Sequence, residues 1–216
     1  GISDRLSDPK NYAALQYAAD IAALIARLNV ARVDWIGTSM GGLIGMILAA
    51  KPNTPIRRLV LNDIGPFIPK AALQRIAGYL GTDPLFPAMA AAERYTREVH
   101  AGFGPLTDEN WRSLTRHGVR PEAGGGFRLR YDPAIAIPFR AAAESDADLW
   151  PVWAQIRVPV LVLRGDASDV LTANTARLMA QGGLDGKGPK ARVIEIQGGG
   201  HAPALMDRAQ IEIIAT

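Results

Sequence analysis

Alternating apolar and polar positions predict a helix, a strand, a second helix and a second strand in the first part of the chain. The helix covers residues 8–29, and its apolar side chains repeat with the i, i+3, i+4, i+7 spacing of one buried face: Ile21, Leu24, Ile25 and Leu28. Apolar runs then predict a strand at 33–36, a buried helix at 41–50 and a strand at 58–63. Because both strands are apolar, we expect a parallel βαβ unit.

The middle of the chain departs from this alternation. Residues 66–150 carry Ala-rich segments separated by prolines, which predict a mostly helical insertion. Alternation then returns, and it predicts strands at 160–163 and 191–196 and helices at 173–181 and 209–215.

A glycine-flanked serine lies between the strand 33–36 and the helix 41–50. The segment Gly37-Thr38-Ser39-Met40-Gly41 has the form Gly-x-Ser-x-Gly. On a sharp turn from strand to helix, such a serine adopts strained backbone angles, and the glycines allow close approach of neighbouring backbone. The helix start also directs free amides toward developing negative charge. We therefore predict that Ser39 is a nucleophile.

A serine nucleophile needs a base, and the chain has three histidines. His100 and His117 lie in the insertion beside charged neighbours, where solvated surface side chains are expected. His201 instead follows the last predicted strand in a glycine-rich loop, at the carboxyl end of a parallel sheet. We predict that His201 is the base.

The acid that orients the base has three candidates. Asp169 follows the strand 160–163 and precedes two apolar residues that would anchor it beside the core, so we favour it. Asp166, in the same loop, is an alternative that could equally cap the loop. Asp63, at the end of the preceding strand, is a weaker third candidate whose carboxylate the two following amides could satisfy.

The order Ser39, Asp169, His201 resembles that of the α/β-hydrolase fold superfamily. Four segments carry the resemblance: 35–42 at the nucleophile turn, 61–66 at the entry to a cap, 163–171 at the acid loop and 200–203 at the histidine loop. The resemblance implies an α/β fold with a mostly parallel sheet, flanked by helices, and a helical cap between two strands. It also implies that Ser39 is the nucleophile, Asp169 the acid, His201 the base and the Met40 amide an oxyanion donor.

On this resemblance the chain divides into three parts: core residues 1–65, cap residues 66–150 and core residues 151–216. The cap is expected to set the substrate range. Four aromatic side chains offer apolar contact area for substrate, although each taken singly is more typical of packing: Trp111, Tyr131, Trp150 and Trp153.

The expected function is that of a serine hydrolase that cleaves a small or medium ester, thioester or lactone through an acyl-enzyme on Ser39. Serine at the turn excludes the haloalkane dehalogenases and epoxide hydrolases, which use aspartate there. Carbon–carbon bond hydrolases, hydroxynitrile lyases and perhydrolases stay open, as does a non-catalytic binding protein with the same fold. The expected partner is a small-molecule acyl substrate.

The resemblance leaves the amino-terminal strands of the family unmatched. Residues 1–4, Gly-Ile-Ser-Asp, resemble the tail of a Gly-x-Gly-x-Ser segment, and on the order of 80 residues would precede it in a family member. The second oxyanion donor belongs to that part. We therefore expect this chain to belong to a longer protein or to pair with an amino-terminal fragment.

Composition further limits the kinds of site, partner and location that we expect for this protein. The 216 residues include no cysteine, which excludes disulfides and cysteine-bound metals. The net charge of +3 comes from scattered basic residues, so nucleic acid is not an expected partner. The charge-free apolar run 35–50 is shorter than the roughly 20 residues of a membrane span, and the start lacks a signal-peptide pattern, so a cytoplasmic location is expected. No cofactor motif is present: the glycines at 198–200 and 41–42 lack the residues of a dinucleotide or phosphate loop.

Overall fold

The computed structural model describes residues 3–215 and contains a parallel sheet with strand order β1-β2-β7-β8. The strands are β1 (Val33–Thr38), β2 (Ile56–Asn62), β7 (Val160–Gly165) and β8 (Arg192–Ile196). Each neighbouring pair is parallel. The carboxyl ends of all four strands therefore lie at one edge of the sheet, where loops that follow different strands can meet.

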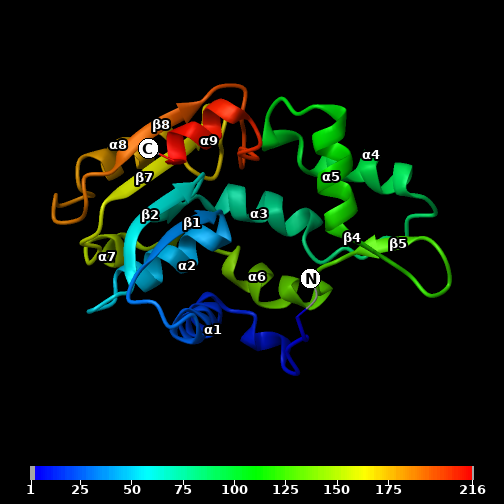
Figure 1. The fold of residues 1–216 in the computed structure, drawn as a ribbon, viewed down its shortest axis with the longest axis horizontal. Helices are drawn as coiled ribbons and strands as arrows, with labels where there is room; N and C mark the ends of the chain where they lie inside the picture. Colours follow the sequence, from blue (N-terminus) through cyan, green and yellow to red (C-terminus); the bar gives the residue numbers. More distant parts are fainter. Residues whose placement is uncertain (1–2, 216) are drawn as a thin grey trace.

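Helices from both ends of the chain flank this sheet: α1 (Ala14–Arg27), α2 (Met40–Ala49), α7 (Trp150–Trp153), α8 (Ala173–Ala180) and α9 (Arg208–Ala215). In Figure 1, α1 and α2 lie beside β1, whereas α8 and α9 lie near β8 at the other end of the sheet. Helix α2 connects the parallel strands β1 and β2, which confirms the predicted βαβ unit.

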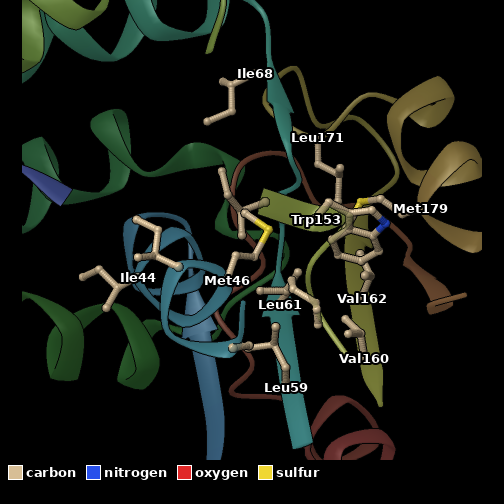
Figure 2. Packing of buried hydrophobic residues seen from close by; sticks show 14 of the residues in the cluster. Ile44, Met46, Leu59, Leu61, Ile68, Trp153, Val160, Val162, Leu171 and Met179 are labelled. Atoms are coloured by element: carbon tan, nitrogen blue, oxygen red, sulfur yellow. The ribbon is translucent and has the colours of Figure 1, made fainter. Parts of the chain in front are cut away.

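The core forms around α2 and the two central strands. Seven of the ten residues of α2 are buried, as expected of a helix that is apolar on all sides. Met46 of this helix, Leu61 of β2 and Val162 of β7 have no exposed surface, and Figure 2 shows them together in one cluster. This packed core fixes the positions of the strand ends on which the candidate site is built.

The chain between β2 and β7 forms the insertion. It contains β3 (Phe67–Ile68), α3 (Lys70–Tyr79), α4 (Met89–Val99), α5 (Asp108–Gly118), β4 (Val119–Pro121), β5 (Phe127–Leu129), α6 (Ala136–Ala142) and β6 (Ala147–Asp148). In Figure 1, α4, α5 and the β4–β5 hairpin lie away from the sheet, with α3 extending from the sheet toward them. The antiparallel pair β3–β6 joins the two ends of the insertion.

The structure confirms the predicted elements of the core and adds detail in the insertion. The two small antiparallel pairs were not predicted, because strands of two or three residues are too short to reveal an alternation of apolar and polar residues. The first helix begins at Ala14 rather than near Asp8, since Asp8 caps a separate 3₁₀ turn, Pro9–Asn11, and Ala13 is extended. Gly1 and Ile2, part of the segment compared with a Gly-x-Gly-x-Ser sequence, lie outside the described residues. Within residues 3–215, no helix has the length and apolar character needed to cross a membrane.

Candidate active site

Ser39 lies on the sharp turn between β1 and α2, with the strained backbone angles expected there: φ is 50° and ψ is −117°. Crowding explains two of the glycines around it. A Cβ at Gly37 would collide with the backbone of Gly41, and a Cβ at Gly42 would collide with the Ile64 side chain. At Gly41 itself a Cβ would meet no atom within 4 Å. The close approach therefore requires Gly37 and Gly42, whereas the expected steric role of the glycine two after the serine is not found.

His201 faces Ser39, as predicted from its place after the last strand of the sheet. Its Nε2 lies 2.9 Å from the Ser39 Oγ, and its side chain is only 8% exposed. On the other side of the ring, Nδ1 lies 2.7 Å from Oδ2 of Asp63. A carboxylate can only accept at this position, so Nδ1 carries the proton and Nε2 is free to accept the serine proton.

Asp63, not Asp169, contacts the histidine, and this corrects the preferred prediction. Asp63 follows β2, is completely buried and adopts a positive φ of 54°. Besides the histidine, its carboxylate accepts hydrogen bonds from the Gly165 amide at 2.8 Å and the Ser168 hydroxyl at 2.6 Å. The amides of Ile64 and Gly65, the alternative partners considered for this carboxylate, donate no hydrogen bond to it; Gly165, Ser168 and His201 hold it instead.

Ser168 is a functional neighbour that the sequence reasoning missed. Its hydroxyl oxygen accepts hydrogen bonds from the amides of Val170 and Leu171, at 3.2 and 3.0 Å. The hydroxyl proton is therefore directed to Asp63. The acid loop after β7 thus supplies a hydroxyl to the site, and the acid itself comes from the adjacent strand β2.

Asp169 lies in the same loop but pairs with the insertion. Its carboxylate accepts two hydrogen bonds from the Arg75 guanidinium of α3, at 2.5 and 2.8 Å. Partial burial raises the pKa of Asp169, but the Arg75 hydrogen bond and charge outweigh this and leave the pKa below its ordinary value. The other candidate, Asp166, accepts a hydrogen bond from the Gly199 amide at 3.1 Å and so holds the histidine loop, in agreement with the capping alternative.

A buried asparagine joins three parts of the site. Asn62, the last residue of β2, donates from Nδ2 to the Pro203 carbonyl at 2.8 Å and to the Thr38 hydroxyl at 3.1 Å. Its backbone carbonyl accepts from the Ser39 amide at 3.0 Å. One residue next to Asp63 therefore links the serine turn to the loop that carries the histidine.

Met40 occupies the expected place for an oxyanion donor. It is the first residue of α2, so its N–H has no acceptor one turn earlier in that helix. Met40 is 43% exposed and borders the cavity beside Ser39.

A cavity of about 430 Å³ opens beside the serine. Its walls come from α1, α2, α3 and α6 and are mostly apolar, with Ser39, Leu43, Leu73, Ile76, Phe139 and Val170 among the lining residues. Apolar walls around a single nucleophile suit a ligand whose acyl part is largely hydrocarbon.

Three tyrosines are among the lining residues: Tyr12, Tyr17 and Tyr79. Tyr12 donates to Asp132 at 2.7 Å, so its hydroxyl is already engaged. Tyr17 has a buried hydroxyl with no hydrogen-bond partner among the described residues. Burial, followed by the nearby Tyr12 and Asp20, raises the pKa of Tyr17 to about 12, so at neutral pH it remains a neutral donor. The periodicity of α1 gave no signal that this tyrosine lines a cavity, and its predicted buried face is only partly right: Ile25 is buried, but Leu24 and Leu28 are 55% and 56% exposed.

The four aromatic residues expected to bind substrate do not line the Ser39 cavity. Trp150 and Trp153 are buried in the main core, where Figure 2 shows Trp153 beside Met179. Trp111 is buried in α5, with the Arg97 guanidinium 5.6 Å from its ring centre. Tyr131 borders a second cavity in the insertion. Packing, the alternative stated for each residue singly, explains the three tryptophans.

Comparison with known proteins agrees with the fold. The model of the alpha/beta hydrolase family matches residues 1–214, and the chain belongs to that family. It is 42% identical, over 99% of its length and 74% of the relative's, to 3-hydroxybutyrate-oligomer hydrolase of Cupriavidus necator. It is 30% identical, over 80% of its length and 60% of the relative's, to 2-(acetamidomethylene)succinate hydrolase of Mesorhizobium japonicum.

Comparison with solved structures also indicates the alpha/beta hydrolase fold. An alpha/beta hydrolase from Novosphingobium aromaticivorans is 35% identical, with a TM-score of 0.86 over all of this chain and 75% of that one. The structure of E-2-(acetamidomethylene)succinate hydrolase is 26% identical, with a TM-score of 0.80 over the same shares. The family and its hydrolase-named relatives indicate that the protein is a hydrolase.

Proposed function

We propose that this protein is a serine esterase that works through an acyl-enzyme on Ser39, with His201 as base and Asp63 as acid. The observation that carries the proposal is the continuous hydrogen-bonded series from the Ser39 hydroxyl to His201 and from His201 to Asp63, at 2.9 and 2.7 Å. Nucleophile, base and orienting acid in this geometry define the chemistry of acyl transfer independently of their order in the chain.

The steps follow from the positions of these groups. The Ser39 oxygen attacks the ester carbonyl while its proton passes to His201 Nε2, and Asp63 stabilises the resulting imidazolium. The Met40 amide donates to the oxyanion. Collapse of the tetrahedral intermediate breaks the carbon–oxygen bond, His201 protonates the departing alkoxide, and the acyl group stays on Ser39. Water then gives a proton to His201 and attacks the acyl carbon, which releases the acid and restores the serine.

The cavity favours an ester with a medium-sized apolar acyl part. Its walls are mostly apolar and offer hydrocarbon contact to such an acyl part. The name of the Cupriavidus relative refers to oligomers of a hydroxy acid, and hydroxy acids joined head to tail are linked by ester bonds. An ester is therefore preferred over the β-diketone of a carbon–carbon bond hydrolase or the peroxide of a perhydrolase.

Residues 66–150 would act as the cap in this proposal. Helices α3 and α6 supply part of the cavity wall, and the chain between α4 and α5 reaches the histidine loop, where the Gly200 amide donates to the Gly102 carbonyl at 2.8 Å. A Cβ at Gly102 would lie 2.8 Å from the His201 carbonyl oxygen, so this contact depends on glycine. The insertion is thus placed to shape the substrate range and to cover the reacting atoms.

The deciding experiment combines labelling with turnover. The protein should react with a fluorophosphonate at Ser39, hydrolyse short- and medium-chain p-nitrophenyl esters, and show a transient acyl adduct by mass spectrometry. Ser39→Ala should lose all three while keeping its circular dichroism spectrum. An adduct that forms but does not resolve within seconds would favour a non-catalytic binding protein, and preferential cleavage of β-diketones would favour the carbon–carbon bond hydrolase.

A further inference from the structure

A second cavity, of about 400 Å³, lies within the insertion. It is bordered by α3, α4, α5 and the β4–β5 hairpin, and its lining includes Tyr95, Val99, His100, Leu114, His117, Leu129, Arg130 and Tyr131. Tyr79 and Leu80, at the end of α3, line both this cavity and the one at Ser39. The two cavities are therefore neighbours, separated by a wall to which these two side chains belong.

The two cavities differ in charge. No lysine, arginine or histidine lines the cavity at Ser39, whereas the second contains Arg130, His100 and His117 and no Asp or Glu in its lining. An arginine keeps its positive charge at any pH of interest. The second cavity is therefore a partly enclosed space with a permanent cation and no anion in its walls.

Arg130 has no carboxylate partner among residues 3–215. Its Nε donates to the Val119 carbonyl at 3.1 Å, which fixes the side chain but leaves the charge uncompensated. The other arginines of this hairpin are different: Arg120 pairs with Glu122, and Arg128 pairs with Glu122 and Asp83. The acids nearby are thus already engaged with other cations.

Three other polar groups of the cavity, His100, Tyr79 and Tyr131, are neutral hydrogen-bonding groups. Burial lowers the pKa of His100, so its ring is neutral at neutral pH, and it stacks on Phe103 with ring centres 4.5 Å apart. Burial also raises the pKa of Tyr79 and Tyr131, which keeps both hydroxyls protonated. The Tyr131 hydroxyl is engaged, since it donates to the Thr82 carbonyl and accepts from the Gly81 amide. Arg130 is therefore the permanently charged group of this lining and can recognise an anion by charge.

We propose that the substrate is an elongated ester whose scissile carbonyl lies at Ser39 and whose free carboxylate, at the far end, binds Arg130 in the second cavity. The inference rests on the proposed esterase function and adds a substrate class to it. A guanidinium forms paired hydrogen bonds with a carboxylate, which makes such a contact selective for this group. The names of both curated relatives, which refer to hydroxybutyrate and to a succinate, describe carboxylic acids.

The shared wall gives the proposal a geometric condition. A substrate that reaches both cavities must pass Tyr79 and Leu80, so these side chains have to move aside or border an opening. Short carboxylate esters would reach only the first cavity and gain nothing from Arg130. The benefit of a terminal carboxylate should therefore appear only above a minimum chain length.

The test uses p-nitrophenyl monoesters of dicarboxylic acids of increasing length, each compared with its methyl-capped diester. Above the minimum length, we expect the protein to prefer the free acid over the capped ester in kcat/KM. Arg130→Gln should lower kcat/KM for the long free acids by roughly 10- to 100-fold, as for loss of a charge-assisted hydrogen bond, and leave the capped esters unchanged. Arg130→Lys should recover part of the loss. Arg116→Gln, an exposed arginine of α5 outside the cavity lining, is the matched control and should change neither series.

The outcomes separate the two proposals. Turnover of capped esters with no preference for the free acids at any length, or a preference that survives Arg130→Gln, would overturn the carboxylate site and leave the esterase intact. Failure to cleave any ester, together with no labelling of Ser39, would overturn the proposed function itself. A preference lost equally in Arg116→Gln would show that overall charge, rather than this cavity, attracts the anion.

Discussion

Oδ2 of Asp63 lies 2.7 Å from Nδ1 of His201, although 138 positions separate the two residues in the chain. The parallel sheet explains this distance, because Asp63 follows β2 and His201 follows β8, and the carboxyl ends of both strands lie at the same edge. Asp63 is fully buried and His201 nearly so. The hydrogen bond between them is therefore shielded from water, which strengthens its orienting effect on the imidazole.

The first prediction compares the two aspartates that follow neighbouring strands. Asp63→Asn should lower kcat by about 10⁴, because an amide at this position favours the wrong histidine tautomer. Asp169→Asn is the matched control and should lose less than about tenfold, since its partner is Arg75. Steady-state kinetics on one ester decides it. The opposite ranking would return the acid role to Asp169.

The second prediction concerns Ser168, which donates to Asp63 and accepts two backbone amides. Ser168→Ala leaves buried partners unsatisfied, so we expect the free energy of unfolding to fall by about 1–3 kcal/mol. Because Asp63 keeps two other donors, kcat should fall far less than in Asp63→Asn. Urea unfolding and kinetics on the same variant test both parts. A loss of kcat equal to that of Asp63→Asn would mean that Ser168 acts on the reacting groups directly.

Hydrophobic periodicity and turn residues in the sequence were enough to predict part of the site. Ser39 and His201 could be predicted because a glycine-flanked serine between strand and helix, and a histidine after the last strand, have few alternative explanations. The acid could not be settled in the same way. Asp63, Asp166 and Asp169 all follow parallel strands at one sheet edge, and which one meets the imidazole depends on side-chain direction and backbone angles. The positive φ of Asp63 is a property of the folded turn.

The substrate cavity was also beyond the sequence pattern. Tryptophans in the insertion and after it suggested apolar contact area for substrate. Trp150 and Trp153 are instead buried in the main core. The walls beside Ser39 come instead from α1, α2, α3 and α6, four helices brought together by tertiary packing. Ordinary apolar positions such as Leu73 and Ile76 carry no local sign that they face a cavity rather than a neighbouring helix.

The third prediction concerns the ion pair between Arg75 of α3 and Asp169 of the core. Both side chains are 45% exposed, so the pair should contribute no more than about 1 kcal/mol to stability. The pKa of Asp169 is lowered in the folded state. Its contribution is therefore fully present above the unfolded pKa, about 3.9, and is lost as the pH falls through the lower folded value.

A double-mutant cycle with Arg75→Gln and Asp169→Asn, measured by urea unfolding at neutral pH and again near pH 2.5, tests this pair. The coupling energy should be small at neutral pH and should decrease in acid. A coupling that is unchanged at low pH would show that the charge of Asp169 is not involved.

The last prediction concerns the outer edge of β1. Among residues 3–215, β1 pairs with β2 alone, so its other edge has no strand beside it, and Ile36 on this strand is 56% exposed. An unpaired strand with an exposed apolar side chain is a template for association with another strand. We expect the 216-residue chain expressed by itself to self-associate, and Ile36→Lys to reduce this because a charge at an edge opposes strand pairing. Ile137→Lys, which replaces a similarly exposed isoleucine on α6, is the matched control and should have less effect. Light scattering and gel filtration at several concentrations give the measurement; a monodisperse monomer for the unmodified chain would show that this edge is protected within the 216 residues.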